Sequence, residues 1–106
     1  MDNFKIIYKI LTALEAAMDL PAFDMSQISH ESMGVSQERW ARYMEMMVDL
    51  ELVKGARISR NIADETQVEN RNLRITLKGL EYLTENSIMQ RIYKAAKGIK
   101  EILPGL

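Results

Sequence analysis

The sequence predicts a mostly helical α+β domain, in which helices surround a single two-stranded hairpin. Two patterns support this prediction. Apolar residues recur at spacings of three and four along most of the chain, as in amphipathic helices, and the stretch Leu73-Arg74-Ile75-Thr76 alternates as a half-buried strand does. The chain has 106 residues, of which 47% are hydrophobic and 27% are charged. That length and composition are typical of one globular domain with its own core, so we expect a single domain over residues 1–106.

The composition also narrows the classes of function. There is no cysteine, which excludes disulfides and thiolate chemistry. No apolar run approaches the roughly 18 residues of a membrane span, and the N-terminus lacks the layout of a signal peptide, so we expect a cytoplasmic protein. The net charge is −1, so any attraction to DNA must come from local basic patches.

The first predicted helix covers residues 2–18. Its apolar stripe consists of Phe4, Ile7, Tyr8, Leu11, Leu14 and Met18. Ile6 and Ile10 widen this stripe, so we expect the helix to touch two elements, the body and a partner subunit. Pro21 ends the helix.

Two further helices are predicted between residues 24 and 51. Asp24 and Gln27 form a capping-box pattern for a short helix over about 25–32, and Gly34 is suited to a left-handed turn after it. Ser36 then caps a helix that runs to about residue 51. The two helices form a helix-turn-helix candidate. The longer one places a core face opposite an exposed face, with Trp40, Tyr43, Met44, Met47 and Leu50 on the first and Glu38, Arg42, Glu45 and Asp49 on the second.

The hairpin is predicted over residues 52–76. Its first strand covers 52–58 with a bulge at Gly55, a long polar loop covers 59–70, and the second strand returns over 71–76. Thr76 then caps a helix over 76–85 in which Gly79 permits close approach of another element.

A last helix is predicted from Ser87 to about residue 103, after Asn86 closes the preceding one. Its apolar residues are spaced by 4, 3, 4 and 3, as in a short heptad seam: Ile88, Ile92, Ala95, Ile99 and Ile102. We expect this seam to pack against the first helix, either in the same chain or in a twofold mate. Ala95 and the neighbouring Ala96 stand where a membrane-surface helix would need bulky apolar groups, which argues against such a helix.

This order of elements resembles a winged helix-turn-helix domain: a three-helix core, a two-stranded wing hairpin and an additional C-terminal helix. More narrowly, the chain is similar to the YjcQ-like family in Lys5-Ile6-Ile7-Tyr8-Lys9-Ile10-Leu11, in the Leu77-x-Gly79-x-x-Tyr82-Leu83-x-Glu85-Asn86 stretch and in the basic Tyr93-Lys94-Ala95-Ala96-Lys97. The resemblance spans nearly the whole chain. It implies a helix-turn-helix at about 24–51, a wing at about 52–76 and C-terminal helices at about 77–103. By analogy with the wider superfamily it also implies DNA binding.

The residues give little support to catalysis. His30 is the only histidine, and it is placed at the end of a short helix, where a surface or capping role is usual. The sequence has no glycine-rich phosphate loop and no paired-acid signature. We therefore expect no enzyme activity, no cofactor and no metal.

The side chains suited to DNA lie on the third helix and the wing. We predict contacts from Ser36, Gln37, Arg39, Arg42 and Tyr43 near bases, and from Arg57, Arg60 and Arg71 on phosphates. Acidic residues on the exposed face of the third helix limit the contact to its first turn and a half, and the acidic wing tip disfavours minor-groove insertion. The predicted function is thus a small bacterial or phage transcriptional regulator that binds double-stranded DNA. The alternative is a non-catalytic protein-interaction module on the same scaffold that does not bind DNA.

Overall fold

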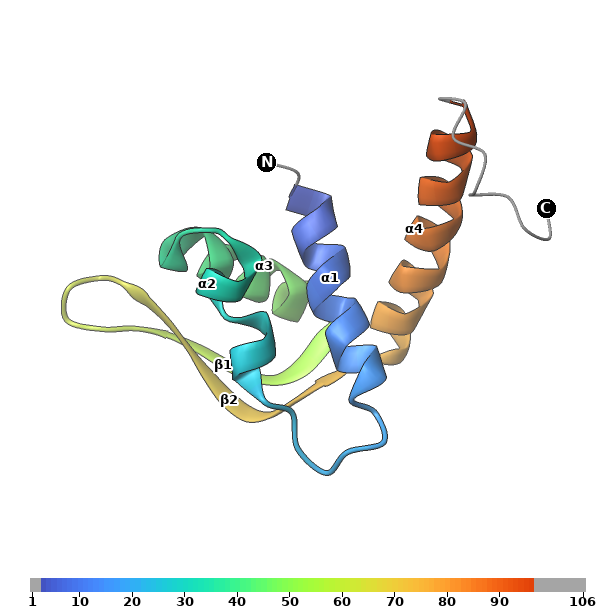
Figure 1. The fold of residues 1–106 in the computed structure, drawn as a ribbon. Coiled ribbons are helices and arrows are strands. Elements are labelled where there is room, and N and C mark those ends of the chain that lie inside the picture. Colours follow the sequence, from blue (N-terminus) through green and yellow to red (C-terminus); the bar gives the residue numbers. More distant parts are fainter. Residues whose placement is uncertain (1–2, 97–106) are drawn as a thin grey trace.

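The computed structural model describes residues 3–96, with side chains described as far as Asn86. Four α-helices, one 3₁₀-helix and one antiparallel hairpin make up this part of the chain (Figure 1). Their bounds are α1 Asn3–Ala16, η1 Met25–Ile28, α2 His30–Met33, α3 Gln37–Asp49, β1 Val53–Arg60, β2 Thr66–Ile75 and α4 Leu77–Ala96. This is the predicted α+β fold: a winged-helix-like arrangement with an added C-terminal helix.

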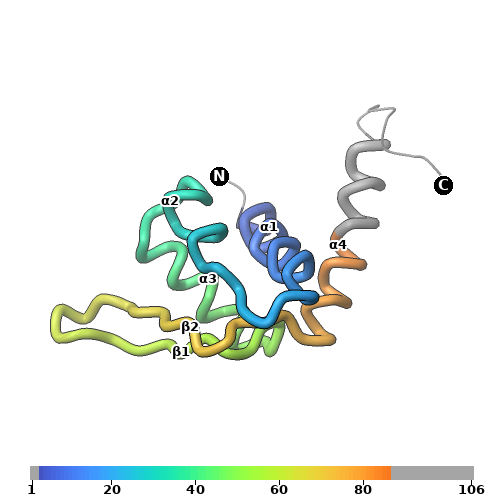
Figure 2. Tube along the Cα trace, turned by 60° about the horizontal axis from the view of Figure 1, so that its bottom comes forward, coloured from blue at the N-terminus to red at the C-terminus, as the bar shows by residue number. Residues whose placement is uncertain are grey.

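Helix α1 lies in the middle of the molecule. Figure 1 shows α2 and α3 on one side of it and α4 on the other, and the hairpin runs beneath them and projects beyond α3. Figure 2 shows the same projection from a second direction. The buried side chains of α1 are Ile6, Ile7, Ile10, Leu11 and Leu14. Phe4 and Met18, which the apolar stripe places with them, are instead 68% and 57% exposed.

The predicted helix over 25–32 is wrong, because the structure divides it into η1 and α2. Ser29 separates the two, with its backbone at φ −59° and ψ 158° and its side chain accepting a hydrogen bond from the Ser32 amide at 3.1 Å. A serine hydroxyl offers the backbone this capping alternative to a continuous helix. Asp24 caps η1 through the Ser26 amide at 2.9 Å, and that hydrogen bond lowers the pKa of the Asp24 carboxyl.

The turn between α2 and α3 is as predicted. Gly34 adopts φ 73°, and the amides of Gly34 and Val35 donate to Glu31 and His30 carbonyls at 3.2 and 3.0 Å. A glycine at this position closes a helix without a steric penalty. Ser36 then accepts from the Arg39 amide at 3.1 Å and begins α3.

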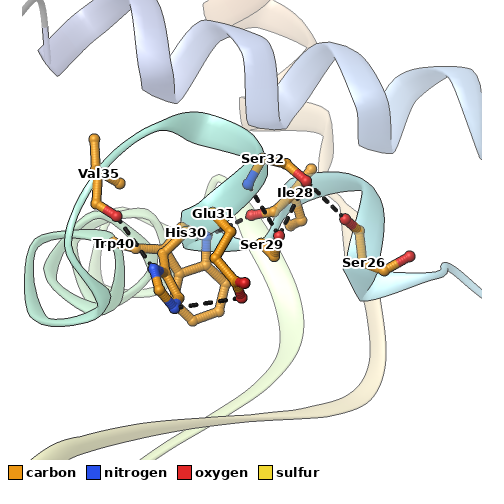
Figure 3. Close-up of polar contacts among 8 residues, drawn as sticks. All are labelled: Ser26, Ile28, Ser29, His30, Glu31, Ser32, Val35 and Trp40. Atoms are coloured by element: carbon orange, nitrogen blue, oxygen red, sulfur yellow. Dashed lines mark hydrogen bonds and ion pairs between the residues drawn. The ribbon is translucent and has the colours of Figure 1, made fainter.

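Helix α3 is joined to η1 through the Trp40 indole. The Trp40 Nε1–H donates to the Ile28 carbonyl at 2.6 Å, as Figure 3 shows. Leu50 was predicted to belong to the core face of α3, but it is 64% exposed. The helix ends at Asp49, and Glu51 turns the chain at φ 60°, so that Leu52 is buried in its place.

The hairpin is longer than predicted. Strands β1 and β2 pair from Val53↔Ile75 to Arg60↔Thr66, so the connecting loop covers only 61–65 and not 59–70. Its outer part carries only a weak apolar alternation: Thr66 is buried and Ile58 and Val68 are half-buried, whereas the residues next to them along the strands are exposed. The predicted bulge at Gly55 is present, with φ 86° and a register shift between Lys54 and Ala56.

Helix α4 begins at the predicted cap but continues further than predicted. Thr76 accepts from the Gly79 amide at 3.1 Å, and a Cβ on Gly79 would lie 2.4 Å from the Leu52 carbonyl oxygen. The predicted break at Asn86 is wrong. The Asn86 side chain donates to the Tyr82 carbonyl at 2.9 Å, four residues earlier in the same helix, and the backbone continues to Ala96.

Candidate nucleic-acid interface

The candidate interface is built from the first two turns of α3 and the adjoining wing. Gln37, Arg39 and Arg42 are exposed on this part of α3. The hydroxyl of Ser36 is engaged as the helix cap. A groove of about 330 Å³ opens here, lined by Asn3, Ser36, Glu38, Arg39, Arg42, Tyr43 and Met46. Two guanidinium groups and a helix N-terminus therefore border one depression, and both features attract anions.

The structure gives Tyr43 a different place from the one predicted. Tyr43 is only 2% exposed, and its hydroxyl donates to the side-chain oxygen of Asn3. The same oxygen accepts from Arg39 Nη1 at 2.9 Å, and Arg39 Nη1 lies 3.5 Å from the Tyr43 hydroxyl. Tyr43 thus orients Arg39 from the core. The ring faces the core because tyrosine is mostly apolar, and only its hydroxyl needs a polar partner.

Sequence reasoning missed the role of Glu38. Its carboxylate accepts a hydrogen bond from the Thr66 amide at 3.3 Å, which ties the first turn of α3 to the start of β2. The two residues are 28 positions apart, and no local pattern connects them. Thr66 is paired with Arg60 across the hairpin, so this bond also brings Arg60 beside the first turn of α3.

The predicted phosphate ligands of the wing are all exposed, and two of them have acidic neighbours. Arg71 lies 3.0 Å from Glu69, and Arg60 lies 3.8 Å from Asp64. Arg57 is opposite Glu69 in the strand register, but the Glu69 carboxylate pairs with Arg71. Exposed pairs of this kind contribute about 0–1 kcal/mol, so a phosphate can replace the carboxylate at small cost.

Acidic residues occupy the later turns of α3. Glu45 is half-buried and Asp49 is exposed, whereas Arg39 and Arg42 come earlier in the helix. The positive part of α3 is therefore its N-terminal half, the end that Glu38 joins to the wing.

His30 supports the turn of the helix-turn-helix. Its Nδ1 lies 3.2 Å from the Val35 carbonyl and its Nε2 lies 3.6 Å from Glu31, as drawn in Figure 3. Because a carbonyl only accepts hydrogen bonds, Nδ1 acts as the donor. Among the described side chains, up to Asn86, no cluster of three or more histidine, aspartate or glutamate residues is arranged to hold a metal ion. Among the described helices, none has the length and hydropathy needed to cross a membrane.

The predicted heptad seam of Ile88, Ile92, Ala95, Ile99 and Ile102 lies outside the residues whose side chains are described. Dimerisation through it stays a prediction.

Comparison with known proteins gives one match. The family model described as YjcQ protein matches residues 8–102. No curated protein and no solved structure matches the chain. The matched segment covers residues 8–16 of α1, the helix-turn-helix, the wing and α4. The chain therefore belongs to the YjcQ family.

Proposed function

We propose that this protein binds double-stranded DNA through the N-terminal half of α3 and the wing, and acts in the cytoplasm as a small bacterial or phage transcriptional regulator. One observation carries the proposal: the Glu38–Thr66 hydrogen bond places exposed arginines of α3 and of the wing on adjoining surfaces. A winged-helix domain uses the corresponding helix in the major groove and the wing on the backbone.

The charge distribution defines how the helix would enter the groove. Arg42 and Gln37 are exposed near the N-terminus of α3, and the N-terminal end of a helix favours phosphate through its free amides and dipole. Asp49 would be repelled by the phosphates if the helix lay flat along the groove. The proposed docking is therefore end-on, with Arg57 and Arg60 reaching the backbone beside it.

The test is fluorescence anisotropy of a labelled random-sequence duplex, titrated with protein at low and at physiological salt. We expect binding that weakens steeply as salt rises, because each phosphate contact releases counterions. Arg42→Ala and Arg57→Ala should each weaken binding to any duplex and lower the slope of log K against log salt by about 1. Lys9→Ala is the matched control, since Lys9 is an exposed cation on α1.

Two results would contradict the proposal. The first is no binding at a protein concentration of about 100 μM, where non-specific DNA binding normally appears. The second is equal affinity of the Arg42→Ala, Arg57→Ala and Lys9→Ala variants.

A second function is favoured by a separate observation on α3. Met46 and Leu50 are 49% and 64% exposed beside the acidic Glu45 and Asp49. Exposed apolar side chains with a charged border are typical of protein-interaction surfaces. A nuclease-treated pulldown that returns one stoichiometric protein, lost in Met46→Glu, would support this module. Retention of that protein by Met46→Glu would exclude the surface.

The heptad seam predicted on the last helix implies, in addition, a homodimer formed through the first and last helices. Replacing Ile92 and Ile99 together by glutamate should then raise the dissociation constant of the dimer in sedimentation velocity, and should yield a monomer if the seam is the only contact between the copies. A wild type that already sediments as a monomer would show that the seam packs within the chain.

A further inference from the structure

The tip of the wing carries a large apolar side chain that faces solvent. Ile62 is fully exposed in the loop 61–65, which we call the wing tip. The loop is held in one shape by its own hydrogen bonds. The Asn61 and Glu65 backbones are joined at 3.0 Å, the Asp64 amide donates to the Asn61 carbonyl at 2.9 Å, and the Asn61 side chain bridges to Glu65 at 2.9 and 3.0 Å. Because the loop that carries Ile62 is already held in one conformation, ordering it on binding costs little conformational entropy.

A groove of about 300 Å³ lies at the other end of the wing. It is formed where the segment after α1 meets the last residues of β2, and we call it the basal groove. Leu14, Leu73 and Ile75 give it buried apolar walls, and Met18 and Leu20 on its border are 57% and 59% exposed. The groove therefore offers an aliphatic surface that the chain itself leaves partly uncovered.

The two sites carry opposite charge. The wing tip holds Asp64 and Glu65, both exposed; Arg60 lies 3.8 Å from Asp64, so Glu65 supplies the negative charge that no basic side chain pairs within the tip. The basal groove is lined by Arg74, which is exposed and whose guanidinium donates to the Asn72 carbonyl at 3.0 Å. This hydrogen bond holds the guanidinium at the border of the groove. Complementary charge next to an apolar contact favours one orientation of two docking surfaces.

We propose that two copies of this chain exchange wing tips, so that Ile62 of each copy docks in the basal groove of the other. Strand β1 has 8 residues, which at about 3.3 Å each separates tip from groove by roughly 26 Å. When the two wings lie side by side and point in opposite directions, the tip of each copy reaches the groove of the other. A twofold axis makes the two contacts identical, and the assembly closes as a dimer.

The same observations disfavour DNA as the partner of Ile62. An aliphatic side chain is a known wedge between base steps, but Asp64 and Glu65 beside it would face the phosphates on either side of the minor groove. Of the basic residues proposed for DNA contact, Arg42 and Arg57 are in neither the tip nor the groove. Arg60 is next to the tip, because its guanidinium donates to the Asp64 carbonyl at 3.2 Å. The variants Arg42→Ala and Arg57→Ala therefore test DNA binding without changing either surface of the tip exchange.

The test is sedimentation of the full chain carrying Ile92→Glu and Ile99→Glu, which removes the separate seam predicted on the last helix. In this background we expect a dimer. Adding Ile62→Asp should raise its dissociation constant by at least about tenfold, because a charge cannot enter the aliphatic groove. Adding Leu77→Asp is the matched control: Leu77 is 72% exposed at the start of α4, remote from the wing tip, and the dimer should persist.

A charge exchange tests the orientation. Arg74→Glu should dissociate the dimer, and Arg74→Glu combined with Glu65→Lys should restore it. The proposal is overturned if the seam-deficient protein is monomeric at every concentration, or if Ile62→Asp dimerises as well as the Leu77→Asp control. Failure of the charge exchange to restore the dimer would equally reject the docking of this tip in this groove. A monomeric protein whose DNA affinity falls with Ile62→Asp would place the tip on DNA and reject the exchange.

Discussion

The Thr76 hydroxyl joins three segments of the chain. It accepts from the Gly79 amide at 3.1 Å at the start of α4, and it donates to the Glu51 carbonyl after α3. The Thr76 amide donates to the Leu52 carbonyl at 3.1 Å. Gly79 lies against the same Leu52 carbonyl, where a Cβ would be only 2.4 Å away. One small polar residue and one glycine therefore fix where α4 leaves the base of the wing.

The Thr76→Ala variant tests this arrangement. We expect it to lose about 1–2 kcal/mol of the free energy of unfolding, because the helix loses its cap and the Glu51 carbonyl loses a donor. Urea denaturation followed by circular dichroism measures the change. Thr12→Ala is the control, since the Thr12 hydroxyl only donates to the Tyr8 carbonyl within α1. An equal loss in both variants would show that the Thr76 contacts contribute nothing beyond helix propensity.

At the scale of elements, two side-chain hydrogen bonds join the wing to the helical part of the molecule. Glu38 on α3 accepts from the Thr66 amide at 3.3 Å. Asn70 donates from its side chain to the Phe23 carbonyl at 3.0 Å and accepts from the Leu73 amide at 2.7 Å. The first contact fixes the wing against α3, and the second fixes it against the segment before η1. The base of the wing is also held by Val53, Leu73 and Ile75 in the core, so these side-chain hydrogen bonds fix mainly its outer part relative to α3, on which the proposed DNA contact depends.

The Glu38→Ala variant should release the outer contact. The Thr66 amide then loses its side-chain acceptor, and we expect its hydrogen exchange to be about tenfold faster, the equivalent of one hydrogen bond. Amide exchange followed by NMR gives the rate at this position. Glu45→Ala on the same helix should leave it unchanged. If the Thr66 amide exchanges at the wild-type rate in Glu38→Ala, the bond does not hold the wing in solution.

At the scale of the whole molecule, one core connects the elements. Ile10 and Leu11 of α1 are fully buried, and the same cluster includes Trp40 and Met44 of α3 and Leu83 of α4. The helices, the hairpin and the loop before η1 all contribute to it. Because no element has a second core of its own among the described residues, we expect them to unfold together.

Unfolding measured with two probes tests this expectation. Trp40 fluorescence reports on the environment of α3, and far-ultraviolet circular dichroism reports on all helices. The two transitions should coincide, and Leu11→Ala should move both by about 2–5 kcal/mol, because it leaves a cavity at a fully buried position. Lys9→Ala, at an exposed position two residues earlier in α1, should move neither. Two separate transitions would contradict the single domain predicted from the length of the chain.

The sequence by itself determined the features that depend on residues within one turn. The caps at Ser36 and Thr76, the left-handed Gly34 and the bulge at Gly55 were all predicted, because each follows from a residue's own backbone freedom or from a side chain that reaches an amide two or three positions away. The apolar periodicity of α1 and α3 gave the fold class for the same reason. The motifs at the two ends of the chain also gave the YjcQ family.

Only the tertiary structure decided the features that depend on distant partners. Tyr43 was predicted at the DNA surface, and its burial against Asn3 involves a residue 40 positions away. Glu38 accepts from Thr66, 28 positions away, and the outer wing forms strands through backbone pairing although only a weak apolar alternation marks it. Of the predicted interface, the residue types were thus readable in the sequence. Their orientation was not, because packing against distant segments sets which side chains remain exposed.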